Sequence, residues 1–191
     1  LEQLCAAARA HCFHSVCVSG SRVELAHTLL EDTDVKVTGL VGFPLGTADA
    51  DAKRYETEVA IDLGAQEIEM VLNLGRLKDG DHRCVLRELR DIAEAAEQRP
   101  VKVILETSLL TPDEQTLACQ LVLDSGAHCV CTGTGLQAAA TVEDVRSLRT
   151  AVGVKFGVKA VGFPDLATAL ALVEAGATRL GTTQGPAGLN L

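Results

Sequence analysis

The chain has 191 residues, of which 47% are apolar and 23% are charged, so we expect one domain spanning residues 1–191 with a sizeable core. No apolar run approaches the roughly 20 residues of a membrane span and no signal-peptide pattern opens the sequence, which predicts a soluble, cytoplasmic protein without a membrane partner. A net charge of −9, scattered basic residues and 3% aromatic residues disfavour nucleic acid as a partner.

Helical and extended segments alternate from the start of the chain to its end. We expect helices at residues 1–12, 22–30, 48–63, 82–98, 111–125, 142–150 and 166–174. We expect strands at residues 15–19, 35–42, 67–73, 101–106, 129–132, 157–161 and 179–182. Because a helix separates nearly every strand from the next, the sheet should be parallel.

Three segments of the chain follow one formula, in which an amphipathic helix ends on a Gly-Ala pair and a short apolar strand follows. The pairs are Gly64-Ala65, Gly126-Ala127 and Gly176-Ala177. Glycine just past the last helical turn supplies a left-handed C-cap. The apolar run after each pair suits a strand that is covered on both faces. The repeat therefore predicts successive α/β units.

Seven predicted strands are one fewer than a closed eight-stranded barrel contains. We expect an α/β fold of the TIM (β/α)8 type, either with the first strand missing before residue 1 or with a barrel that stays open or borrows an element. A doubly wound open sheet is the alternative, but the segment after the first strand, at residues 18–22, has one glycine and no dinucleotide-binding fingerprint. In a barrel, catalytic side chains lie at the carboxyl ends of the strands.

Polar side chains alternate on the predicted inward faces of four strands. These faces carry Glu67, Glu69 and Asn73, then Lys102 and Glu106, then Cys129, Cys131 and Gly133, and finally Lys159. A lysine among apolar neighbours is costly unless it is paired or deprotonated, so Lys159 is a candidate nucleophile or acid–base group. A structural ion-pair network, or a Lys159 that extends into solvent, remains an alternative. For Glu69, pairing with Lys102 and a role in proton transfer are both open.

Seven cysteines, an odd number in an acidic chain, indicate free thiols rather than a disulfide framework. The segment Cys129-Val130-Cys131 is too closely spaced for a typical zinc site, and His128 falls on the opposite strand face. Most of the cysteines fit a role as small buried hydrophobic residues. We therefore expect neither a metal nor another cofactor.

Glycine-bearing loops follow the last three predicted strands. They contain Thr134 and Gly135, then Gly162, and finally Gly181, Thr182 and Thr183. Backbone amides and hydroxyls in such loops form anion-binding concavities, and phosphate commonly binds beside the last strands of α/β barrels. The loops favour a small sugar phosphate as ligand, although each glycine could also serve only to form a tight turn.

Taken together, several stretches resemble those of the deoxyribose-phosphate aldolase family. They are Ser15-Val16-Cys17-Val18, Val41-Gly42-Phe43-Pro44-Leu45-Gly46, Glu67-Ile68-Glu69-Met70-Val71-Leu72-Asn73-Leu74-Gly75, Lys102-Val103-Ile104-Leu105-Glu106-Thr107, Thr132-Gly133-Thr134-Gly135, Gly157-Val158-Lys159-Ala160 and Gly181-Thr182-Thr183. The resemblance implies a TIM barrel and a lyase of deoxyribonucleotide catabolism. Such an enzyme cleaves 2-deoxyribose 5-phosphate to acetaldehyde and glyceraldehyde 3-phosphate through a lysine Schiff base.

The resemblance also assigns roles to individual residues. Lys159 matches the family's second active-site lysine, Glu69 falls at its proton-relay aspartate, and Lys102 matches the lysine that accompanies it. Gly135, Gly162, Gly181 and Thr183 match its phosphate site, whereas Phe163 and Gln184 depart from it. The main departure is Cys131, which stands where the family has its Schiff-base lysine.

A thiol cannot form an iminium, so we expect aldolase activity that is impaired, with Lys159 as the amine or as an acid–base group. The alternative is a catalytically inactive relative that binds a sugar phosphate or a partner protein. A third hypothesis makes Cys131 a thiolate nucleophile beside Lys159. A homodimer is left open.

Overall fold

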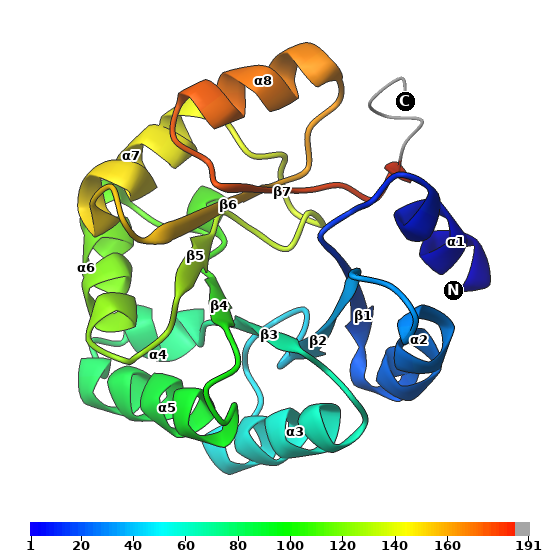
Figure 1. Ribbon diagram of the computed structural model, residues 1–191. Coiled ribbons are helices and arrows are strands. Elements are labelled where there is room, and N and C mark those ends of the chain that lie inside the picture. Colours follow the sequence, from blue (N-terminus) through cyan, green and yellow to red (C-terminus); the bar gives the residue numbers. More distant parts are fainter. Residues whose placement is uncertain (186–191) are drawn as a thin grey trace.

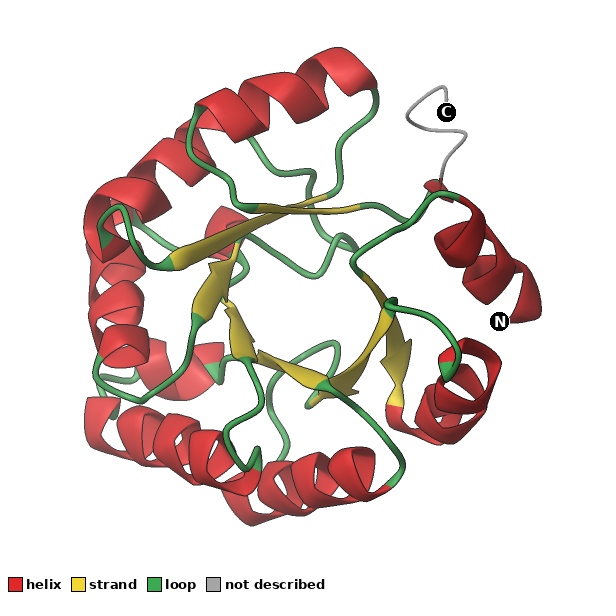
Figure 2. Ribbon diagram, in the orientation of Figure 1, coloured by secondary structure: helices red, strands yellow, loops and turns green. Residues whose placement is uncertain are grey.

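Seven parallel strands, paired in sequence order, curl around a common axis and form the inner wall of the molecule, while the helices surround them on the outside (Figure 1). The computed structural model describes residues 1–185. Colouring by secondary structure shows the same ring of helices around the strands (Figure 2). Within the described residues β1 pairs only with β2, and β7 only with β6, so the barrel-type sheet is open between its first and last strands.

The elements alternate as the sequence predicts. The strands are β1 (Ser15–Ser19), β2 (Lys36–Val41), β3 (Glu67–Val71), β4 (Val101–Ile104), β5 (Cys129–Cys131), β6 (Gly157–Val161) and β7 (Arg179–Gly181). The helices are α1 (Glu2–Ala10), α2 (Val23–Leu30), α3 (Ala50–Asp62), α4 (Leu74–Lys78), α5 (His82–Ala95), α6 (Pro112–Leu123), α7 (Val142–Val152) and α8 (Leu166–Glu174), with the short 3₁₀ turns η1 (Gly20–Arg22) and η2 (Thr107–Leu109). The parallel α/β barrel architecture is confirmed.

Two predicted strands extend two residues too far, and the structure gives the reason for each. β3 ends at Val71 because the side chain of Asn73 accepts a hydrogen bond from the amide of Arg76 and caps α4, a helix that the sequence did not predict. β4 ends at Ile104, and Glu106 adopts the left-handed conformation with φ of 51°. The prediction that Asn73 and Glu106 continue the inward alternation of their strands is therefore wrong.

The Gly-Ala repeat forms the helix ends that it predicts. Gly64, Gly126 and Gly176 have φ of 100°, 90° and 114°, a region that side chains with a Cβ rarely adopt. The next amide turns back to the helix at two of the three sites, from Ala65 to the carbonyl of Ala60 and from Ala177 to that of Leu172. The chain leaves each helix in the direction of the following strand, so these strands begin at the same edge of the barrel.

A buried ion pair joins the outer helices to the central strands. Nζ of Lys53, on α3, lies 2.7 Å from Oε1 of Glu88, on α5, and donates a second hydrogen bond to the carbonyl of Val71 at the end of β3. The side chains are 0% and 2% exposed. Burial lowers the pKa of Lys53 and raises that of Glu88, so each group relies on the other to remain charged. The pair fixes the end of the strand that carries Glu67 and Glu69.

Candidate active site

Four charged side chains from three strands meet inside the barrel, and we call them the interior ion cluster: Glu67, Glu69, Lys102 and Lys159. Strand pairing sets Glu69 beside Lys102, and Lys159 extends toward Glu69 from β6. Nζ of Lys159 lies 2.6 Å and 2.8 Å from the two carboxylate oxygens of Glu69. Two acids and two amines therefore share one water-poor space.

The immediate surroundings of Lys159 favour its charged form. Its side chain is 12% exposed. Burial alone would lower the pKa of the amine, but the charge of Glu69, its hydrogen bond and smaller effects of the nearby thiols together outweigh burial and raise the pKa above its usual range. A Cβ on Gly181 would lie 3.0 Å from Cε of Lys159, so glycine at this position gives the lysine room. Lys159 is an enclosed, protonated ammonium with a proton acceptor in contact.

Lys102 makes its shorter contact with Glu67 rather than with Glu69. Its Nζ lies 2.7 Å from Oε2 of Glu67 and 3.2 Å from the hydroxyl of Thr38, but 3.5 Å from Oε2 of Glu69. Burial raises the pKa of Glu67, but the opposing effects of Lys102 and His14 are larger together and bring the value down to about 2. Of the two roles left open for Glu69, its short contacts are with Lys159 rather than with Lys102.

Cys131 lies in an apolar part of the barrel interior. It is fully buried and packs in a small cluster with Val71, Ile104 and Cys129. Burial and the nearby carboxylate of Glu69 raise the pKa of the thiol well above its ordinary value. A thiol held neutral is a poor nucleophile, so this environment does not provide the thiolate that the third hypothesis requires.

The other cysteines differ in their exposure. Cys5, Cys119 and Cys129 are buried with Cys131, whereas Cys12 and Cys17 are exposed and Cys84 is intermediate. All seven are free thiols. Within residues 1–185 no group of three or more histidine, cysteine, aspartate or glutamate side chains converges in the manner of a metal site. Helices in the same range all lack the length and apolar character needed to cross a bilayer.

The three glycine-bearing loops lie next to one another at the carboxyl ends of β5, β6 and β7. The amide of Gly162 donates to the carbonyl of Gly181, and the amide of Ala140 donates to the carbonyls of Val161 and Gly162. Gly135 has φ of 79°, and a Cβ there would lie 3.1 Å from Val161. The predicted phosphate-site glycines are therefore brought together at one edge of the barrel.

The hydroxyls of these loops are partly committed to internal bonds. The hydroxyl and amide of Thr134 both donate to Oε2 of Glu106, and the hydroxyl of Thr182 accepts from the amide of Gln184. Thr183 is exposed. Backbone amides and Thr183 are consequently better placed than Thr134 to receive an anion.

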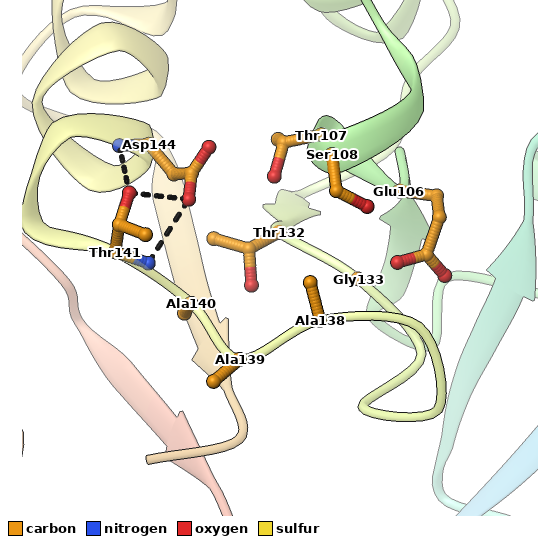
Figure 3. Close-up of a pocket in the computed structure, with 10 residues that line it drawn as sticks. All are labelled: Glu106, Thr107, Ser108, Thr132, Gly133, Ala138, Ala139, Ala140, Thr141 and Asp144. Atoms are coloured by element: carbon orange, nitrogen blue, oxygen red, sulfur yellow. Dashed lines mark hydrogen bonds between the residues drawn. The ribbon is translucent and has the colours of Figure 1, made fainter.

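A pocket of about 210 Å³ lies between η2 and the segment at residues 132–144 (Figure 3). Glu106, Thr107, Ser108 and Thr132 line it together with the alanines at residues 138–140, and Lys159 does not. Sequence reasoning did not predict this pocket, because it depends on the left-handed turn at Glu106 and on η2, neither of which has a local sequence signal.

Sequence reasoning also missed two residues of the barrel interior. Thr38, on β2, donates to Glu67, and its alternation with Leu40 on a predicted strand could have indicated an inward position. His14 precedes β1, and its Nε2 lies 2.9 Å from Oε1 of Glu67. No spacing in the sequence links His14 to residue 67, because the contact spans 53 positions along the chain.

Comparisons with known proteins show which proteins the chain is similar to. The model of the DeoC/LacD family aldolases matches residues 1–152. A deoxyribose-phosphate aldolase of Alkaliphilus oremlandii is 46% identical over 186 residues, covering 96% of this chain and 84% of that protein. One of Streptococcus equi subsp. zooepidemicus is 49% identical over 187 residues, covering 97% and 85%.

Solved structures give the same result. The aldolase QR15 superposes with a TM-score of 0.92 at 34% identity, covering 96% of this chain and 83% of that one. The tetrameric deoxyribose phosphate aldolase of Aeropyrum pernix superposes with a TM-score of 0.89 at 28% identity, covering 96% and 79%.

Proposed function

Because the chain belongs to the DeoC/LacD aldolase family, we propose that it cleaves 2-deoxyribose 5-phosphate reversibly to acetaldehyde and glyceraldehyde 3-phosphate, with Lys159 as the amine. The observation that carries the proposal is the contact of Nζ of Lys159 with both carboxylate oxygens of Glu69, at 2.6 Å and 2.8 Å, inside the barrel. The name that its relatives share, deoxyribose-phosphate aldolase, supports the choice of substrate.

The reaction begins with a proton transfer within this pair. Glu69 takes a proton from Lys159, and the free amine attacks the aldehyde carbon of the open-chain sugar. Loss of water gives an iminium at C1. The hydroxyl on C3 then loses its proton, and the bond between C2 and C3 breaks with its electron pair passing to the iminium, so that C3 to C5 leave with the phosphate as glyceraldehyde 3-phosphate. Protonation of the remaining two-carbon enamine and addition of water then release acetaldehyde and restore Lys159.

In this proposal the glycine-bearing loops bind the phosphate of the substrate. The backbone amides near Gly135, Gly162 and Gly181, together with Thr182 and Thr183, would hold the phosphate at the carboxyl edge of the barrel. Lys102 would take part indirectly, through its 3.5 Å contact with Glu69. Cys131 would line the apolar part of the interior and take no part in proton transfer.

Trapping the iminium tests the proposal directly. Incubation with 2-deoxyribose 5-phosphate and sodium borohydride should leave a stable secondary amine on Lys159, detected by peptide mass spectrometry, and Lys159→Met should abolish it. Lys155→Met removes an exposed lysine from the same region and serves as the control, with labelling of Lys159 expected to be retained. If neither Lys159 nor Lys102 carries an adduct, the chain does not form a Schiff base.

The pH dependence of cleavage provides a second prediction. The pKa of Lys159 is raised in the folded protein, so the free amine is scarce at neutral pH and increases as the pH rises toward that pKa. The rate should therefore rise about tenfold per pH unit from neutrality into the alkaline range, with no plateau below the ordinary pKa of lysine. Steady-state rates measured with an aldehyde-coupled assay would show this, and a plateau near pH 7 would contradict it.

A second candidate function rests on Cys131. Its neutral, buried thiol cannot form an iminium, and the tight ion pair between Lys159 and Glu69 opposes deprotonation. A chain without turnover would still present the glycine loops and could bind a sugar phosphate or a partner protein. Calorimetric binding of 2-deoxyribose 5-phosphate without product formation would favour this function over the first.

Assembly and location form part of the same proposal. We propose that the protein is cytoplasmic, because cysteines remain as free thiols in that compartment. We also propose a homodimer in solution, although the aldolase of Aeropyrum pernix is tetrameric. Multi-angle light scattering of the purified chain distinguishes a dimer from a monomer or a tetramer.

A further inference from the structure

The interior ion cluster continues to the amino-terminal end of the barrel through His14. This residue lies in the loop between α1 and β1, and its side chain is 42% exposed, whereas that of Glu67 is 8% exposed. Nε2 of His14 lies 2.9 Å from Oε1 of Glu67. The backbone carbonyl of His14 accepts from the amide of Lys36, which fixes the loop against the start of β2.

The contacts form one series across the interior. From the half-exposed ring of His14 they pass to Oε1 of Glu67, from Oε2 of Glu67 to Lys102 at 2.7 Å, from Lys102 to Glu69 at 3.5 Å, and from Glu69 to Lys159 at 2.6 Å. Each carboxylate thus has at least two cationic or hydrogen-bonding partners. A change in the contacts of Glu67 therefore changes how Lys102 divides its contacts between Glu67 and Glu69, and so changes the contact that Glu69 makes with Lys159.

The weak point of the series is the contact between Lys102 and Glu69. Lys102 could approach either carboxylate, and the structure holds it on Oε2 of Glu67, which also accepts from Thr38, while His14 fixes Oε1. As long as Lys102 stays there, both oxygens of Glu69 are free to contact Lys159. The orientation of Glu67 therefore decides how completely Glu69 is committed to Lys159.

We propose that His14 is a positioning residue for Lys159. By holding one oxygen of Glu67, it keeps the other oxygen on Lys102 and leaves Glu69 to the amine that, in the proposed function, reacts with substrate. Loss of His14 lets Glu67 turn toward the open amino-terminal end, and Lys102 then moves onto Glu69. Lys159 loses part of its counter-ion, holds its proton less tightly, and becomes a more reactive amine.

Reductive methylation measures this reactivity without any substrate. Formaldehyde and cyanoborohydride modify the free-amine form, and peptide mass spectrometry gives the rate at Lys159 relative to that at the exposed Lys155 in the same sample. His14→Ala should raise the relative rate at Lys159 roughly two- to fivefold, since half a unit of pKa changes the free amine about threefold. His14→Gln keeps a side-chain N–H donor and should stay near the wild-type rate.

Two further variants separate positioning from a general effect on the fold. His11→Ala removes a histidine from the preceding turn that makes no contact with Glu67, and it should leave the relative rate at Lys159 unchanged. Glu67→Gln should itself raise the rate, and adding His14→Ala to Glu67→Gln should have no further effect, because both changes act through one contact. Thermal unfolding of each variant shows that the comparison is made on folded protein.

The result can overturn the proposal in either of two ways. An effect of His14→Ala equal to that of His11→Ala would show that His14 does not act through Glu67, and so would an effect that persists undiminished in the Glu67→Gln background. Failure of borohydride trapping with sugar phosphate, together with the expected methylation rates, would remove the proposed function and leave the positioning role of His14 in place.

Discussion

Replacing Cys131 with lysine is expected to raise the rate of 2-deoxyribose 5-phosphate cleavage at neutral pH by roughly a hundredfold or more. Strand register pairs Cys131 with Lys159, so the new amine would lie beside an existing ammonium. Like charges at this distance lower each other's pKa, which provides the free amine that the wild-type site lacks. Initial rates and borohydride trapping at position 131 measure the gain.

The control for this substitution is Cys131→Met, which introduces a side chain of comparable reach without an amine and should not raise the rate. Far-ultraviolet circular dichroism and thermal unfolding establish that both variants fold, because Cys131 is fully buried and a longer side chain must find room toward Lys159. A folded Cys131→Lys protein with unchanged activity would show that another part of the site, with Phe163 and Gln184 as candidates, limits turnover.

Replacing Lys53 with methionine should lower the free energy of unfolding by about 3–5 kcal/mol, since it leaves the carboxylate of Glu88 buried without its partner. The substitution also removes the hydrogen bond to the carbonyl of Val71, at the end of the strand that carries Glu69. Urea titration of the wild type and the variant gives the difference directly.

The double variant Lys53→Met with Glu88→Leu should recover most of this loss, because no uncompensated charge then remains in the core. Arg54→Ala breaks exposed pairs with Glu58 and Glu94 on the neighbouring surface and should change the unfolding free energy little. A Lys53→Met protein as stable as the Arg54→Ala protein would contradict a stabilising role for the buried pair.

The local sequence pattern was sufficient to predict most of the helices and strands. The strands at residues 15–19 and 157–161 and the helix at residues 166–174 have the predicted bounds, because periodicity and the Gly-Ala helix ends are short-range signals. The strand ends beyond Val71 and Ile104 were wrong, because a side-chain cap at Asn73 and a left-handed residue at Glu106 interrupt extended chain without any change in hydrophobic pattern.

The site could be predicted only in part. Alternation on β3, β4 and β6 correctly placed Glu69, Lys102 and Lys159 on inward faces, since side-chain direction follows from strand geometry. Which acid pairs with which amine depends on the stagger between strands, and the sequence does not specify it. The contact of His14 with Glu67 lies beyond sequence reasoning for the same reason, because a loop residue has no fixed direction.

The left-handed turn at Glu106 has a consequence for how this chain can change over evolutionary time. A Cβ added at Gly133 would lie 2.5 Å from Oε1 of Glu106, so the carboxylate occupies the space that any other residue at 133 would need. Positions 106 and 133 are therefore epistatic. A larger residue at 133 requires the carboxylate of Glu106 to move, which disturbs its hydrogen bonds with the amide and hydroxyl of Thr134, so the cost of a change at 133 depends on the residue at 106.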